Sequence, residues 1–309
     1  MALGCTRRQL LSATMAGAVA AAWPRLGSPQ VAGALRLTEL APDLTLISGA
    51  GANVVAAATA DGLVLVDGGT EAHSAALKGV LAERWPGRPA AVLFNTNWRY
   101  DHTGANAALR TASTAVMAHE NTKLWLGGDF FVEWEHRHYA PRPASMLPSK
   151  TFYTSGELTL GGKRIEYWHL PRAHTDGDVA VFFPEQNVLV ASDLLSVGRY
   201  PVPDYSTGGW IGGFVEATQK LLDSTDADTR VVGSEGGVYG RAQLEAQLEL
   251  CTAVRLKAAE AFRAGMSLAD FVASKPTAPF DAQWGDATLF LPLVYKGGFA
   301  HLRELGGVI

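Results

Sequence analysis

Asn97-Trp98-Arg99-Tyr100-Asp101-His102-Thr103-Gly104 is the stretch that decides the fold, and it directly follows a strongly apolar segment, residues 91–94. A short apolar run that ends in a polar loop predicts a buried strand with functional side chains at its end. Asp101 and His102 are side chains that bind divalent metal ions. Arg99 cannot do so, because its guanidinium group stays protonated and has no lone pair to offer. The loop therefore combines metal-binding residues with one that repels cations.

Three more predicted strands end in a loop that carries a histidine or a carboxylate. The strand at 165–170 leads to His174, the strand at 188–191 leads to Asp193, and the strand at 231–233 leads to Glu235. Each residue alone is as consistent with a turn or a helix cap as with a ligand. Loops at strand ends can meet at one edge of a sheet, however, so together these residues indicate a site for a divalent metal ion.

The order of these motifs resembles that of the metallo-β-lactamase superfamily. Residues 97–104 follow its His-x-His-x-Asp-His signature, with Asn97 and Arg99 in the places of the first two histidines. The later family motifs are matched by Ala-His-Thr-Asp-Gly-Asp at 173–178 and by residues 191–193 and 233–236. The resemblance covers roughly residues 35–305. It implies an α+β fold with four αββα layers, in which two mixed β-sheets pack together with helices outside.

The resemblance also implies which residues hold metal ions. The first site of the family would use positions 97, 99 and 174, so we expect it to be lost. The second site would use positions 101, 102 and 235, with Asp193 as the bridging aspartate. We therefore expect a single divalent ion, Zn²⁺ or else Mn²⁺ or Fe²⁺, held by Asp101, His102, His174, Asp193 and Glu235.

A charge argument supports one ion. Asp101, Asp193 and Glu235 together carry about three negative charges, which a divalent cation and the positive charge of Arg99 would cancel. We therefore expect Arg99 to replace the first metal ion electrostatically. A metal-free pocket stays open as the alternative, with Arg99 in salt bridges to the carboxylates and the two histidines hydrogen-bonded.

The expected function is that of a hydrolase acting on a small-molecule ester, amide, lactam or phosphoester. Asp101 would orient the attacking water, Arg99 would bind an anionic group or a developing oxyanion, and His174 would donate a proton. The alternative is an inactive pseudoenzyme that binds an anionic small molecule through Arg99. Nothing in the sequence determines the oligomeric state.

The N-terminal residues predict export. Thr6-Arg7-Arg8-Gln9-Leu10-Leu11 is a twin-arginine pattern, and the Ala-rich segment 12–22 that follows it offers cleavage sites. We expect a twin-arginine signal peptide and short linker at 1–30, one domain at 31–309, and a periplasmic or secreted protein. The net charge of −4 gives no basic footprint for nucleic acid. No apolar run reaches the roughly 18 residues that a membrane span needs.

The segment 129–150 shows neither helical nor strand periodicity, so we expect a long loop that acts as a lid or a surface loop. Its His136 and His138 are expected to be surface residues rather than ligands. We also expect His119 to cap the helix that follows it, and a helix to begin at about residue 104. Thr70 is expected to cap a helix that continues to about Trp85.

Overall fold

The first β-rich block forms a seven-stranded sheet in the computed structural model, which describes residues 34–306. Its strands are β1 (Arg36–Ala41), β2 (Leu44–Ser48), β3 (Val54–Thr59), β4 (Gly62–Val66), β5 (Ala90–Phe94), β6 (Ala115–His119) and β9 (Lys150–Phe152), in that order across the sheet. Strands β1 to β4 are antiparallel to one another, and β4, β5, β6 and β9 are parallel. The parallel strands therefore end at one edge of the sheet.

The second β-rich block forms a six-stranded sheet. Its strands are β10 (Gly156–Leu160), β11 (Lys163–His169), β12 (Val179–Phe183), β13 (Val188–Ser192), β14 (Arg230–Gly233) and β15 (Val238–Tyr239). All neighbouring pairs are antiparallel except β13 and β14, which are parallel.

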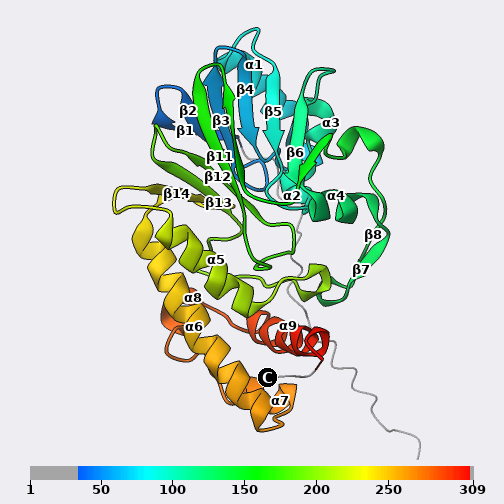
Figure 1. Ribbon diagram of the computed structural model, residues 1–309, viewed down its shortest axis with the longest axis vertical. Coiled ribbons are helices and arrows are strands. Elements are labelled where there is room, and N and C mark those ends of the chain that lie inside the picture. The colour runs from blue at the N-terminus through cyan, green and yellow to red at the C-terminus, as the bar shows by residue number, and fades with distance from the viewer. Residues whose placement is uncertain (1–33, 307–309) are drawn as a thin grey trace, which may run out of the picture. The chain divides into compact units, whose positions relative to one another are not determined.

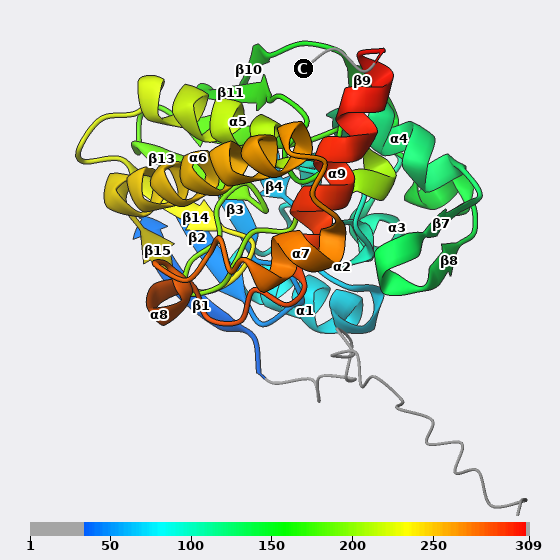
Figure 2. The same ribbon diagram turned by 90° about the horizontal axis from the view of Figure 1, so that it is seen from below.

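Alternation of side chains along the strands builds three apolar layers. Val64 and Val66 of β4 face the second sheet and pack with Val181 and Val190. Leu65, which lies between Val64 and Val66 in the sequence, faces the opposite way and packs with residues of α1 (Ser74–Arg84). The outer face of the second sheet is covered by α5 (Ile211–Asp223), α6 (Arg241–Arg263) and α9 (Phe290–Glu304), as Figures 1 and 2 show. The predicted αββα architecture is confirmed.

Two helix predictions were wrong in detail. Instead of one helix from residue 104, the chain forms two short helices, α2 (Tyr100–Thr103) and α3 (Asn106–Leu109). At Gly104, between them, a Cβ atom would lie only 2.2 Å from the backbone nitrogen of Glu71. Thr70 does not cap the backbone of a helix, because its hydroxyl bonds the Nδ1 atom of His73 at 2.7 Å and α1 begins only after a 3₁₀ turn, η1 (Glu71–His73).

The predicted loop 129–150 contains more regular structure than the sequence suggested. Strands β7 (Phe130–Val132) and β8 (Arg137–Tyr139) form a hairpin around the 3₁₀ turn η2 (Glu133–Glu135), and η3 (Ala144–Met146) follows. These elements are too short to produce a visible period in the sequence. The hairpin follows α4 (Glu120–Gly127), whose N-terminus is capped by the side chain of His119, as predicted.

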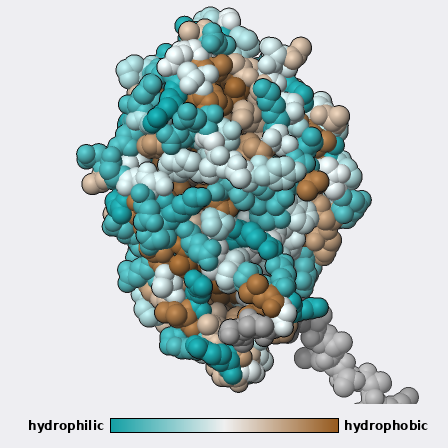
Figure 3. All heavy atoms as spheres, in the orientation of Figure 1, coloured by the Kyte–Doolittle hydropathy of each residue, from teal (hydrophilic) through white to brown (hydrophobic). Residues whose placement is uncertain are grey.

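The remaining helices are α7 (Leu268–Ala273) and α8 (Asp281–Trp284), and a 3₁₀ turn, η4 (Tyr205–Thr207), lies in the loop after β13. Within residues 34–306, no helix has the length and apolarity required to cross a membrane. Figure 3 shows one face on which small hydrophobic groups alternate with hydrophilic ones. The predicted signal peptide and linker at 1–30 lie outside the described residues, so export stays a prediction.

Candidate active site

The candidate site lies where strands of both sheets end. Asp67 directly follows β4, and Asp193 directly follows β13. The backbone turns sharply at both strand ends, because Asp67 and Ser192 adopt positive φ angles of 63° and 52°. Such conformations are uncommon outside glycine and occur often at functional sites. They bring carboxylates from the two sheets to one place.

The imidazole ring of His102 is held between two carboxylates. Its Nδ1 atom lies 2.9 Å from an oxygen of Asp67, and its Nε2 atom lies 2.9 Å from an oxygen of Asp193. Asp67 also accepts hydrogen bonds from Thr96, through the backbone nitrogen and the hydroxyl, and from the hydroxyl of Ser192. Both His102 and Asp67 are buried. The position of this ring is therefore fixed by a fully buried polar network.

This arrangement favours an imidazolium–carboxylate pair. Burial alone would lower the pKa of His102, but Asp193, Asp67 and Asp101 outweigh it and raise the pKa well above its ordinary value. Burial would raise the pKa of Asp193, yet His102 and His174 hold it well below the ordinary value. The site thus carries a positive and a negative group side by side.

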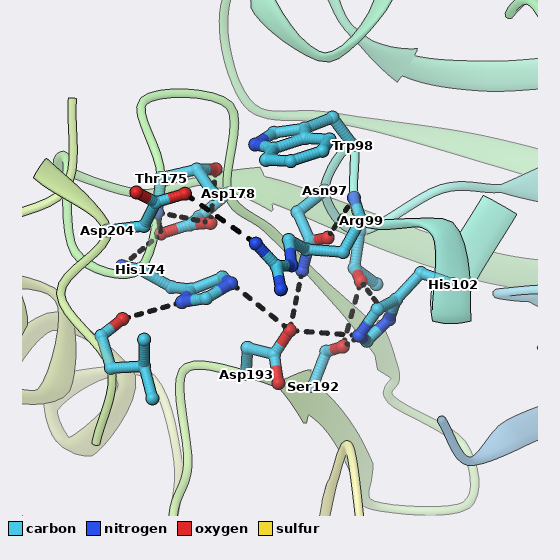
Figure 4. A network of polar contacts seen from close by, with 12 residues as sticks. Asn97, Trp98, Arg99, His102, His174, Thr175, Asp178, Ser192, Asp193 and Asp204 are labelled. Carbon is cyan, nitrogen blue, oxygen red and sulfur yellow. Dashed lines mark hydrogen bonds and ion pairs between the residues drawn. The ribbon is translucent and has the colours of Figure 1, made fainter. Parts of the chain in front are cut away.

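Asp193 is the centre of the site, because three side chains converge on one of its oxygens (Figure 4). Besides His102, the side-chain amide of Asn97 donates to this oxygen at 2.9 Å, and Nε2 of His174 lies 3.5 Å away. Asp193 keeps 19% of its side chain exposed, compared with 6% for His174 and 0% for His102. It is therefore the most accessible member of this group.

His174 is oriented by the loops around it. Its Nδ1 atom lies 2.6 Å from the backbone carbonyl oxygen of Val202. Because a carbonyl oxygen only accepts hydrogen bonds, Nδ1 carries a proton, and the lone pair of a neutral ring would be on Nε2. Nε2 is buried and has no hydrogen-bond partner. Asp178 accepts from the backbone nitrogen of His174 at 2.7 Å, and burial raises the pKa of this carboxyl group to about 6.

Arg99 differs from its predicted role. It forms an ion pair with Glu135 at the tip of the β7–β8 hairpin, and its NH1 atom lies 3.8 Å from a carboxylate oxygen of Asp204. Its guanidinium group also packs over the rings of Trp98 and Trp134. Burial would lower the pKa of Arg99, but Glu135 and other neighbours raise it. The close partners of Arg99 are therefore hairpin and loop residues, not the three carboxylates expected from the sequence.

The structure does not gather the five predicted metal ligands. His102, His174 and Asp193 lie together, whereas Asp101 and Glu235 are exposed. Glu235 lies 2.7 Å from Arg199 in a solvent-exposed ion pair. Within residues 34–306, no group of three or more His, Cys, Asp or Glu side chains is arranged to hold a metal ion.

The side chains as placed do not fit a divalent ion. In Figure 4, His102 and His174 approach the Asp193 carboxylate from opposite sides, and the amide nitrogen of Asn97 contacts the same oxygen. A chelating set would instead direct its lone pairs toward one common point.

Several contributing residues were not found from the sequence. Thr96 and Ser192 support Asp67, and the carbonyl of Val202 orients His174. Asp204 accepts from the backbone nitrogen of Ser206 at 3.1 Å and so caps η4. The pattern of an aspartate before a short turn could have predicted this cap, but it says nothing about the contact with Arg99.

Three other residues with aromatic or reactive side chains make contacts outside the site. Trp98 is buried in an aromatic cluster with Phe130 and Tyr139. His138 pairs with Asp129 on the exposed hairpin at 2.6 Å. The thiol of Cys251 is buried in the core against the second sheet, and burial raises its pKa.

Comparison with known proteins defines the class. The sequence model of the metallo-beta-lactamase superfamily matches residues 48–238. The chain belongs to this superfamily, and the predicted family membership is therefore confirmed.

A curated protein is similar to this chain in sequence. The alpha subunit of 2,4-dinitroanisole O-demethylase from Nocardioides sp. (strain JS1661) is 28% identical over 196 residues, which are 62% of this chain and 54% of that protein. The chain thus spans about half the length of this curated relative.

Solved structures share the fold. A metallo-beta-lactamase from Pontibacter korlensis superposes with a TM-score of 0.55 at 20% identity, over 71% of this chain and 99% of that one. The stereoselective inverting sec-alkylsulfatase Pisa1 from Pseudomonas sp. gives 0.61 at 16% identity, over 89% of this chain and 51% of that one. At such identities the likeness concerns the fold alone.

Proposed function

We propose that this protein is a hydrolase whose reaction takes place beside Asp193, with His174 as the base that accepts a proton from water. The observation that carries the proposal is the orientation of His174. Its Nδ1–H is directed at the carbonyl of Val202, so the buried, unpartnered Nε2 atom is free to accept a proton. An imidazole oriented in this way is a typical general base in enzymes.

Asp193 would assist this step. Its carboxylate lies 3.5 Å from Nε2 of His174, where it stabilises the imidazolium ion that forms when the base takes up a proton. The ion pair with His102 and the hydrogen bond from Asn97 hold the carboxylate in place. This role replaces the one that the sequence suggested for Asp101, whose side chain is exposed.

The expected substrates have leaving groups that depart without help from a metal ion. In an aryl ester, water adds to the carbonyl carbon, His174 takes one proton of the water, and the bond to the aryloxide oxygen breaks. The aryloxide then receives the proton that His174 took up, so the base is regenerated and the products are a carboxylic acid and a phenol. An electron-poor phenol leaves most easily. The name of the curated relative describes the demethylation of a dinitro-substituted aryl ether, which has this kind of leaving group.

The one-ion site expected from the sequence and the anion-binding alternative to it receive less support. The one-ion site stays a prediction, but the placed side chains do not fit an ion. Binding of an anion through Arg99 would require the ligand to compete with Glu135 and with the nearby carboxylate of Asp204. These carboxylates already neutralise the guanidinium group, which disfavours an anionic ligand.

Hydrolysis of 4-nitrophenyl acetate and 2,4-dinitroanisole, followed by release of the coloured phenol with and without a chelator, tests the proposal. We expect turnover that a chelator does not reduce, and we expect His174→Gln to lower it by about 10²- to 10⁴-fold. His301→Gln is the control, because His301 lies on α9 and stacks on Trp210. Equal turnover by the natural chain and His174→Gln would refute the role of the base, and complete loss with the chelator would favour the metal-dependent alternative.

A further inference from the structure

The tip of the β7–β8 hairpin is attached to three other segments. We call residues 130–139 the lid. Glu133 accepts hydrogen bonds from the Nζ atom of Lys296 at 2.8 Å and the hydroxyl of Tyr205 at 2.9 Å. The next residue, Trp134, donates from Nε1 to Asp204 at 2.7 Å. Glu135 then pairs with Arg99, as described above. Three consecutive lid residues thus contact α9, the loop after β13 and the loop after β5.

Asp204 connects the lid to the candidate base. Its buried carboxylate accepts from Trp134 and from the hydroxyl of Thr207 at 2.8 Å. Its backbone nitrogen donates to the backbone oxygen of His174 at 2.9 Å. Two residues earlier, the carbonyl of Val202 accepts from the imidazole of His174. The same short loop, 202–204, therefore holds both the tip of the lid and the ring of His174.

The structure shows the closed state of this arrangement. His174 has only 6% of its side chain exposed, and the partners Arg99 and Glu135 have 17% and 11%. A substrate that reacts at Nε2 of His174 needs more access than this, so the lid has to detach for binding. The base of the hairpin is held by Val132 and Tyr139, which are buried in the aromatic cluster, so the movement concerns its tip. The side chains of residues 133–138 are exposed or half-buried, and such a segment opens at lower free energy than the sheets.

We propose that Asp204 is a positioning residue that couples closure of the lid to the orientation of His174. When the lid closes, Trp134 binds the Asp204 carboxylate and fixes the 202–204 loop, and this loop sets the Nδ1 contact of His174. The role of His174 as a base rests on the proposed function. The coupling itself is a property of the free protein and is measured without a substrate.

Trp134→Phe is the variant that isolates the contact. It removes the Nε1–H donor and keeps an aromatic ring beside Arg99. We expect hydrogen exchange of the backbone amides in residues 130–139 to become about tenfold faster, since a bond to a charged acceptor is lost. We also expect the reaction of His174 with diethyl pyrocarbonate, followed by peptide mass spectrometry, to become about tenfold faster.

Trp125→Phe provides a matched control. Trp125 is in the same aromatic cluster and also donates from Nε1 to a carboxylate at 2.7 Å, but its acceptor is Asp176. We expect both rates to stay at their natural values in this variant.

The results of these experiments distinguish coupling through Asp204 from an effect of aromatic packing. Unchanged lid exchange in Trp134→Phe would overturn it, and faster exchange with unchanged reactivity of His174 would refute the coupling. Equal increases in Trp134→Phe and Trp125→Phe would assign the effect to packing of the aromatic cluster. A chain without hydrolytic activity would refute the proposed function and leave these two rates as valid tests of the coupling.

Discussion

The two sides of Asp193 are built in opposite ways. On one side, His102 is fixed by Asp67 in a network without solvent exposure. On the other side, Asn97 contacts the carboxylate directly, and Arg99 turns away to Glu135 of the lid. We call these the fixed side and the lid side. Positions 97 and 99, where the motif resemblance would place two histidines, both lie on the lid side.

The difference separates a rigid support for His102 from a side whose contacts depend on residues 97 and 99. The strand ends and the buried supports of His102 do not depend on positions 97 and 99, so they persist. A protonated His102 supplies a positive charge next to Asp193. The lid side, in contrast, has gained contacts with a distant hairpin.

Metal content gives the sharpest test. After dialysis against Zn²⁺ and removal of the excess, we expect well below one ion per natural chain. Asn97→His combined with Arg99→His should hold about one ion, because three imidazoles including that of His174 form a normal zinc ligand set. Elemental analysis by mass spectrometry measures both.

Arg99→His alone is the control for this experiment. It removes the positive charge but adds a single imidazole, so we expect low occupancy. One ion in the natural chain would reject the division into two sides. It would support instead the five-ligand site predicted from the sequence.

The fixed side should contribute more to the free energy of unfolding than the lid side. Asp67→Asn keeps the size of the side chain but leaves a buried imidazolium without one of its two carboxylates. We expect the free energy of unfolding to fall by about 3 kcal/mol, since breaking a buried ion pair leaves an uncompensated charge. Urea denaturation followed by circular dichroism measures the change.

Glu135→Gln makes the same chemical change on the lid side. Its pair with Arg99 is partly exposed, and the hairpin can adjust, so we expect a loss of only about 1 kcal/mol. Similar losses in both variants would show that the two sides contribute equally.

The sequence predicted the fold well, because the strands and their order depend on local patterns. Apolar runs identified the strands, and the motif order identified the layers. The partners of Arg99 could not be predicted, since Glu135 and Asp204 lie in distant irregular segments. The exposure of Glu235 was also missed, because a strand-end position does not tell whether the side chain points inward.

The smallest effect concerns buried histidines that have no carboxylate between them. His119 and His169 stack with ring centroids 3.8 Å apart. Burial and then the neighbouring His169 lower the pKa of His119 to about 4, and burial also lowers that of His169. In the unfolded chain both titrate near 6.5. The unfolded state therefore binds more protons between about pH 6.5 and pH 4, and the pair costs stability as the pH falls through this range.

His169→Phe keeps the stack and removes one titrating group, so its melting temperature should fall less between pH 7 and pH 5 than that of the natural chain. The titrating groups of the candidate site are the same in both chains, so their effects on the melting temperature cancel when the two chains are compared. If the melting temperatures of the natural chain and His169→Phe fall equally between pH 7 and pH 5, the stacked pair takes up protons as readily in the folded chain as in the unfolded one. That result would contradict the lowered pKa values of this pair, which contrast with the raised pKa of His102.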